Sequence, residues 1–215
     1  MKWILDNRAL IGDRTVAHLW IALPPILLSF VLSIPIGWFA NRFSRSRSLL
    51  LGGLGILYAI PSLPLFIALP GILGTGLRDP KNVVIALVIY GVALMARATT
   101  EGLQSVDSEV QKAGTALGFS SWSRFWKVEL PLAGPVMLAG IRVVAVSTVS
   151  LTTVGAVLGI KSLGLLFTDG TQRNIPEEIG AGIAMTMLIA LVVDALLVIV
   201  GRVLMPWNVV QRVNQ

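Results

Sequence analysis

The sequence contains no cysteine and only one histidine, His18, and these shortages exclude several kinds of chemistry. Without cysteine the chain has neither a disulfide framework nor a thiolate metal site, and one histidine cannot form a metal centre. No cluster of histidine and carboxylate residues offers a nucleophile, a general base or a metal site. We therefore expect no catalytic residues, no metal and no cofactor in this chain.

A nucleotide-binding loop is also missing. The Gly-x-x-x-x-Gly-Lys-[Ser/Thr] pattern that binds ATP phosphates does not occur, and the nearest approach, 155–162, has Ile160 between Gly159 and Lys161. An ATPase activity of this chain is therefore not expected.

Charged residues make up only 13% of the 215 residues, whereas 55% are hydrophobic and the mean hydropathy is +0.82. Such a chain has too little polar surface to cover a water-soluble globule, so a lipid bilayer must be part of its solvent. The net charge of +6 comes from basic residues that stand singly or in short groups between apolar runs. We interpret them as charges that set membrane topology, not as contacts to nucleic acid.

Five apolar runs predict an all-α integral membrane protein with a single domain over 1–215. A helix needs about 20 residues to cross the hydrocarbon of a bilayer. The expected spans cover about 16–40, 49–70, 83–103, 132–158 and 179–203. The third apolar run is short, and its helix must continue through Arg97 toward Glu101 to span the membrane. Membrane β-strands are not expected, because these runs do not alternate in polarity.

Basic connections indicate the orientation. The connection 41–48 carries Arg42, Arg45 and Arg47, and the segment 97–131 is also basic, so both are expected in the cytoplasm. Five spans then place the N-terminus outside the cell and the C-terminus, with Arg202 and Arg212, in the cytoplasm.

Two features inside the expected spans are candidates for function. The proline-rich stretch YAIPSLPLFIALP at 58–70 could border a pathway, because broken membrane helices usually border a cavity, although helix packing alone is an alternative. Its candidate lining residues are Tyr58, Pro61, Ser62 and Pro64. Arg142 and Asp194 lie at similar expected depths in the cytoplasmic half of the fourth and fifth spans, so they can form an ion pair; alternatively, each meets water or the interface separately.

The cytoplasmic segment 107–130 is too long for a simple turn and too amphipathic to be disordered. It predicts a helix over 108–117, a bend at Gly118, and a second helix capped by Ser120 or Ser121. The second helix carries Trp122, Phe125 and Trp126 at helical spacing and is expected to end at Pro131.

At these residues the sequence resembles the permeases of binding-protein-dependent ABC importers of the methionine-importer structural type. Their signature is Glu-Ala-Ala, three residues, glycine, nine residues, then an aliphatic residue, any residue, Leu and Pro. Ala113, Gly118, Val128, Leu130 and Pro131 match it, whereas Lys112 replaces the glutamate and Gly114 the second alanine. The resemblance implies a type I importer fold with a cytoplasmic coupling helix. The implied ATPase-coupling residues are Lys112, Ala113, Gly114, Leu117, Gly118, Phe119, Val128, Leu130 and Pro131.

The stretches 58–70, 128–142 and 159–172 look closest to the osmoprotectant subfamily, which imports glycine betaine, choline or carnitine. The resemblance implies a bacterial inner-membrane complex with an ABC ATPase, an extracytoplasmic solute-binding protein and a second, identical or related, permease chain. Alternative hypotheses are an ABC permease for another small solute such as an amino acid, a secondary transporter or channel, and a structural membrane subunit.

Overall fold

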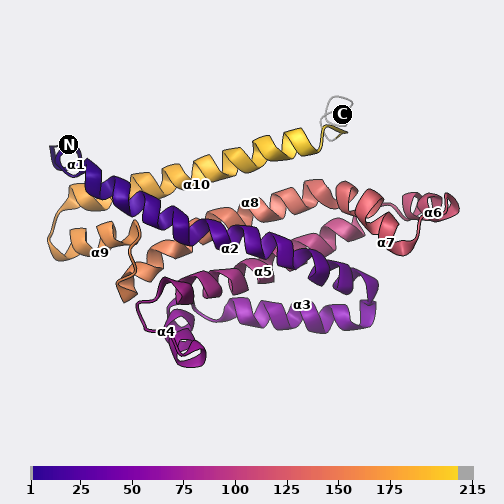
Figure 1. The fold of residues 1–215 in the computed structure, drawn as a ribbon, viewed down its shortest axis with the longest axis horizontal. Coiled ribbons are helices and arrows are strands. Elements are labelled where there is room, and N and C mark those ends of the chain that lie inside the picture. Colours follow the sequence, from indigo (N-terminus) through magenta and orange to yellow (C-terminus); the bar gives the residue numbers. More distant parts are fainter. Residues whose placement is uncertain (1, 208–215) are drawn as a thin grey trace.

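The computed structural model describes residues 2–207, and this part of the chain is a bundle of long helices with short helices at both ends (Figure 1). Arg212, expected on the cytoplasmic side, lies outside the described residues. The α-helices are α1 (Lys2–Asp6), α2 (Arg8–Arg42), α3 (Ser44–Ala59), α4 (Ser62–Leu73), α5 (Pro80–Gln104), α6 (Ser108–Ala116), α7 (Ser121–Arg124), α8 (Leu130–Val154), α9 (Gly164–Gln172) and α10 (Pro176–Leu204). A π-helical turn, Phe125–Glu129, precedes α8, and a 3-10 turn, Gly155–Leu158, follows it.

The long helices run side by side, with α6 and α7 at one end of the molecule and α1 and α9 at the other (Figure 1). Helix α5 is the most buried of the long helices and packs against α2, α3 and α8. Its contact with α2 is close because small residues face each other: Gly91 lies against Ser29, and Gly37 against Thr99. Small residues let membrane helices approach closely, and here Ser33 and Thr99 also share a hydroxyl hydrogen bond of 3.1 Å.

Within the described residues, four helical stretches are long and apolar enough to cross a membrane, namely α2, α5, Ser121–Leu158 and α10. Helices α3 and α4 together provide a fifth candidate, but they are bent by 100° relative to each other. The expected span 49–70 is therefore broken within the proline-rich stretch 58–70. Pro61 explains the break, because it lacks an N–H and holds the preceding Ile60 in an extended conformation. The Tyr90 hydroxyl donates to the freed Ile60 carbonyl at 2.7 Å.

Helix α5 extends beyond the expected range at its start and continues past Arg97 and Glu101 to Gln104. Pro80 occupies its first position, where a missing N–H costs nothing, and the Asp79 carboxylate caps the N–H of Lys81. The connection between α8 and α10 contains a feature that the sequence does not predict, the short helix α9. It packs on α10, where Gly170 and Gly182 provide space at the contact.

Candidate functional site

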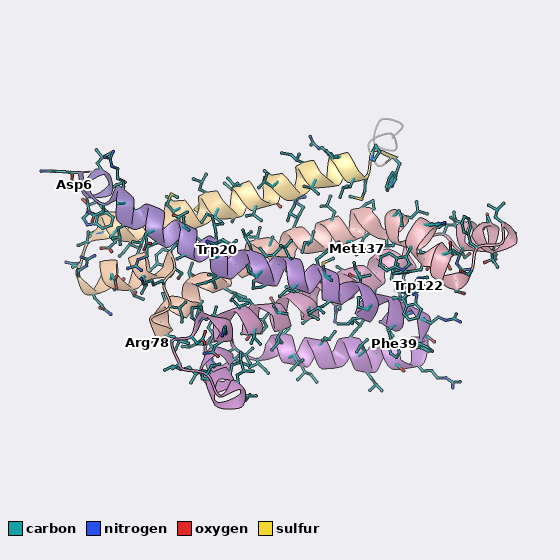
Figure 2. All side chains as sticks on the ribbon, in the orientation of Figure 1. Asp6, Trp20, Phe39, Arg78, Trp122 and Met137 are labelled. Atoms are coloured by element: carbon teal, nitrogen blue, oxygen red, sulfur yellow. The ribbon has the colours of Figure 1, made fainter. Side chains whose placement is uncertain are left out.

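The segment between α5 and α8 projects from the bundle at the end opposite α9 (Figure 1). Figure 2 shows Trp122 of this segment at the opposite end of the molecule from Asp6 and Arg78. Asp107 caps the start of helix α6, because its carboxylate accepts the N–H of Glu109 at 2.8 Å. The segment therefore has its own capped helix, in agreement with the predicted helix over 108–117.

Gly118 ends α6 in the left-handed region, with φ of +84°. The Gly118 N–H donates to the Thr115 carbonyl and the Phe119 N–H to the Gly114 carbonyl, which together form a Schellman motif. A side chain at position 118 would meet no atom of this chain within 4 Å, but it would strain the backbone. Glycine is thus required here by the turn, and its outer side is open to a partner.

The second helix starts at Ser120, whose hydroxyl accepts the N–H of Ser123, as the sequence predicts. The sequence predicts that this helix ends at Pro131, and that prediction is wrong. The π-helical turn leads directly into α8: the Leu130 N–H donates to the Phe125 carbonyl, and Pro131 follows immediately after this turn. The segment is consequently continuous with a membrane-spanning helix.

Arg124 connects the two parts of the segment. Its Nε donates to Glu129 Oε1 at 2.6 Å, another nitrogen of its guanidinium group donates to the Thr115 hydroxyl, and its aliphatic stem lies against Gly114. The Glu129 side chain is only 9% exposed, so this ion pair is largely withdrawn from water. Sequence reasoning missed the pair, because a spacing of five residues does not bring two side chains together on an α-helix, whereas a π-helical turn does.

An aromatic cluster attaches the segment to α2. Trp38 of α2 contacts Trp122 and Phe125 edge to face, with ring centroids 6.4 and 6.3 Å apart, and Trp126 packs against Phe125. Such contacts orient α7 relative to α2.

The expected coupling residues divide into an exposed and a buried group. Lys112, Ala113, Leu117 and Gly118 are exposed, and Leu117 is 80% accessible. Gly114 is buried against Arg124, and the residues of intermediate exposure are Phe119, Val128, Leu130 and Pro131. One side of α6 thus packs on its own chain and the other presents small and aliphatic residues outward.

Arg142 of α8 and Asp194 of α10 are brought together by the fold. The Arg142 guanidinium donates to both carboxylate oxygens of Asp194, at 2.6 and 2.8 Å. Their side chains are 43% and 26% exposed in the single chain. Because a charged group that faces lipid is costly, the exposed side of this pair requires water or another protein chain next to it.

The candidate pathway residues lie around the bend between α3 and α4. Tyr58, Pro61 and Pro64 are exposed, Ser62 is partly buried, and the Tyr58 ring packs edge to face on Tyr90. They are therefore grouped at one bend of the chain.

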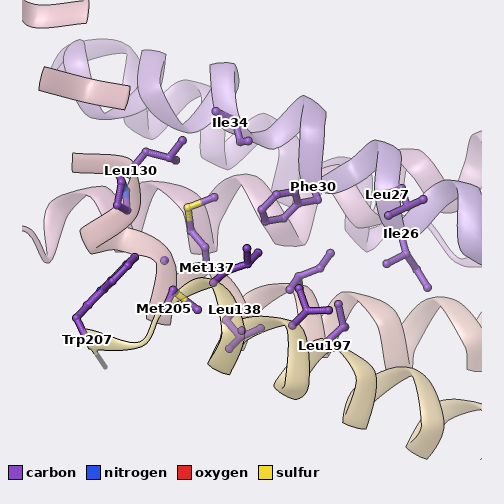
Figure 3. A pocket seen from close by; sticks show the side chains of 16 residues that line it. Ile26, Leu27, Phe30, Ile34, Leu130, Met137, Leu138, Leu197, Met205 and Trp207 are labelled. Atoms are coloured by element: carbon purple, nitrogen blue, oxygen red, sulfur yellow. The ribbon is translucent and has the colours of Figure 1, made fainter. Parts of the chain in front are cut away.

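An apolar cavity of about 450 Å³ lies between α2, α8 and α10 (Figure 3). Figure 3 shows Phe30 and Ile34 of α2 facing Met137 and Leu138 of α8. Its lining is almost entirely hydrocarbon, so it offers a polar solute no hydrogen bonds. Among residues 2–207, no group of three or more histidine or carboxylate side chains is placed to hold a metal ion.

The sequence model of the binding-protein-dependent transport system inner membrane component family matches residues 29–208, and this range includes the whole segment between α5 and α8. The chain belongs to this family. It is a multi-pass inner-membrane permease component of a transport system, and its polar helix pair α6–α7 lies within the matched range.

Curated relatives match this permease over nearly its whole length. The osmoprotectant import permease protein OsmW of Salmonella typhimurium is 31% identical over 92% of this chain and 93% of its own. The glycine betaine/carnitine/choline transport system permease protein OpuCB of Bacillus subtilis is 28% identical over 96% of this chain and 94% of its own.

The fold matches a solved structure of the MetNI methionine ABC transporter in an inward-facing conformation. The TM-score is 0.80 with 16% identity, over 93% of this chain and 98% of the other. At this identity the likeness shows the fold alone, and that fold is the type I ABC importer permease.

Proposed function

We propose that this permease forms the translocation pathway of an ATP-driven importer and that α6 and α7 are its docking site for the ATPase. The observation that carries the proposal is the α6–α7 segment itself. It is capped at both of its helices, braced internally by Arg124, and joined to α8 without a break, while its outer side presents Ala113, Leu117 and Gly118. A partner that moves this segment would move α8 with it.

The same proposal assigns three kinds of partner. The chain has no ATP-binding loop, so ATP hydrolysis belongs to a separate ATPase chain. The family is binding-protein-dependent, which supports delivery of the solute by an extracytoplasmic binding protein. A second permease chain, identical or related, completes the pathway, since the ion pair of Arg142 and Asp194 and the bend at Pro61 are both incompletely covered in the single chain.

The proposed substrate class is an osmoprotectant such as glycine betaine, choline or carnitine. Its support is the likeness over more than nine-tenths of the chain to relatives named for osmoprotectant, glycine betaine, carnitine and choline transport. Selection of the solute belongs to the binding protein, where aromatic side chains can surround a quaternary ammonium group.

Uptake by the reconstituted complex tests the proposal. The permease, its ATPase and its binding protein are placed in vesicles, and uptake of radiolabelled glycine betaine, choline, carnitine and methionine is measured with and without ATP. We expect ATP-dependent uptake of at least one quaternary ammonium solute and none with an ATPase variant that binds but does not hydrolyse ATP.

Two outcomes would contradict the proposal at different levels. Uptake of methionine without any quaternary ammonium solute would overturn the substrate class and leave the importer function intact. Uptake that needs neither ATP nor the ATPase would show a secondary transporter or a channel.

A further inference from the structure

A second cavity, of about 430 Å³, lies between α2 and α5 near the end of the bundle that carries α9. Its apolar lining comes from Ala17, Trp20 and Ile21 on α2 and from Pro80, Val84 and Ile85 on α5. Lys81 and Lys161 complete the lining, so two cations stand at the edge of a hydrocarbon-lined space.

The setting of this cavity matches the boundary between lipid tails and headgroups. Trp20, on the candidate membrane-spanning helix α2, is 76% exposed in the single chain. Tryptophan concentrates at the membrane interface, where its ring meets hydrocarbon and its N–H meets polar groups. Both lysines are exposed, and long lysine stems can lie along apolar surface while the ammonium groups reach the headgroups.

The charges around the cavity are mainly positive. The Arg78 side chain lies beside Gly159, and Gly159 stands two residues before Lys161 in the chain. Arg78 therefore adds a third cation to the two lysines. Among residues 2–207, none of these three cations takes part in a salt bridge. The nearest acids along α2 and α5 are Asp79, which caps the backbone of Lys81, and Asp13, about one helical turn before Ala17.

We propose that this cavity is a binding site for an anionic phospholipid. An acyl chain occupies the apolar space between α2 and α5, and the phosphate of the headgroup lies between the ammonium groups of Lys81 and Lys161. The apolar part of the cavity does not suit a small polar solute, because its lining offers no hydrogen-bond partner. The combination of hydrocarbon, an interfacial tryptophan and unpaired cations fits an amphiphile with a negative headgroup. The inference does not depend on which solute the permease carries.

Lipid retention by the full-length chain in its purified complex tests the site. Native mass spectrometry in detergent compares the binding of phosphatidylglycerol with that of phosphatidylcholine of the same acyl chains. We expect phosphatidylglycerol to bind more tightly to the native protein. The double variant Lys81→Gln/Lys161→Gln should lose about 25-fold in affinity for it, from two lysine contacts of about fivefold each.

Two further variants distinguish the contribution of the cations from that of the apolar space to lipid binding. Lys2→Gln/Arg8→Gln removes the same charge at the same end of the molecule but outside the cavity, and it should bind phosphatidylglycerol as the native protein does. Ala17→Phe fills the apolar part and should weaken the binding of both lipids while the lysines remain.

Several results would overturn the proposal. Equal affinity of the native protein for the two lipids would exclude an anionic site, and unchanged affinity in the double lysine variant would place the lipid elsewhere. If the double variant kept its lipid but lost affinity for the purified solute-binding protein, the cations would be a protein docking surface instead.

Discussion

At the scale of single residues, Gly118 has two properties that separate experiments can address. Its positive φ is required by the turn that ends α6, and its surroundings are open on the side expected to meet the ATPase. Gly74 is a natural control, because it ends α4 with φ of +66° and also has open space around it, but it lies far from α6.

We predict that Gly118→Val allows membrane insertion but weakens ATPase association and transport by about tenfold or more. A β-branched residue in the left-handed region costs about 1–2 kcal/mol of backbone strain, and the added side chain also projects toward the partner. Gly74→Val carries similar strain without that contact. Co-purification of the ATPase and ATP-driven uptake are measured for both variants. Equal losses in the two variants would mean that Gly118 only ends α6 and does not contact the ATPase.

Single residues also differ in whether their contacts can be predicted from the sequence. Ser120 as a cap and Gly118 as a bend follow from residue chemistry, and the structure has both. The contact of Arg124 with Glu129 depends on a local π-helical turn, which no periodic pattern in the sequence signals. The hydrogen bond from Tyr90 to Ile60 joins residues 30 positions apart and needs the tertiary fold.

At the scale of helices, the contact between α2 and α5 sets a strict limit on side-chain size. A Cβ added at Gly91 would lie 2.7 Å from the Cβ of Ser29, which is closer than real contacts allow. The helices must separate to accommodate it, because the neighbouring atom belongs to a short and inflexible side chain.

We therefore predict that Gly91→Ala lowers the stability of the permease by about 1–3 kcal/mol, the usual range for overpacking. Ser29→Gly should recover much of this loss in the double variant, since it removes the conflicting atom. Thermal unfolding of the purified protein, followed by circular dichroism, measures both effects. Gly180→Ala is the control, because its added Cβ meets nothing within 4 Å. An equal loss in Gly91→Ala and Gly180→Ala would contradict the packing argument.

The pairing of α8 with α10 through Arg142 and Asp194 gives a second prediction at this scale. Arg142→Gln and Asp194→Asn should each lower assembly of the permease, because each leaves one charge unpaired within the bundle. The double variant should be better than the sum of the two effects, with a coupling free energy of about 0.5–3 kcal/mol.

The yield of assembled permease that survives detergent extraction is measured for the native protein, the two single variants and the double variant. Arg202→Gln serves as the control, because Arg202 is an exposed cation in the last turn of α10. If the double variant is as poor as the two single effects added together, the contact contributes nothing to assembly.

Proline shows how much of the helix pattern could be predicted. The apolar runs overlap α2, α5, α8 and α10, because length and hydropathy largely determine where such helices form. Pro61 breaks a helix whereas Pro131 lies within the first turn of one, and the residue type alone does not distinguish the two cases. The difference arises because the chain turns sharply at Ile60, where Tyr90 supplies a donor, whereas the helical stretch continues into α8 at Leu130.

At the scale of the whole molecule, the orientation in the membrane remains a prediction. The chain has no cysteine, so single introduced cysteines report without background. Ser46→Cys and Ser120→Cys lie at the end of the bundle expected in the cytoplasm, and Thr171→Cys lies at the other end, on α9. In intact cells only Thr171→Cys should react with a membrane-impermeant thiol reagent, and after lysis Ser120→Cys should react as well. Labelling of Ser120→Cys in intact cells would contradict the predicted topology.

The continuity of α7 with α8 has a mechanical consequence. Ser121–Leu158 is a helical stretch of 38 residues, which corresponds to a rod of about 57 Å at the rise of an α-helix. If such a rod pivots at one end by about 5°, its other end is displaced by about 5 Å, comparable to one helical turn. A small rotation imposed at α7 thus becomes, at the far side of the membrane, a displacement on the scale of a small solute.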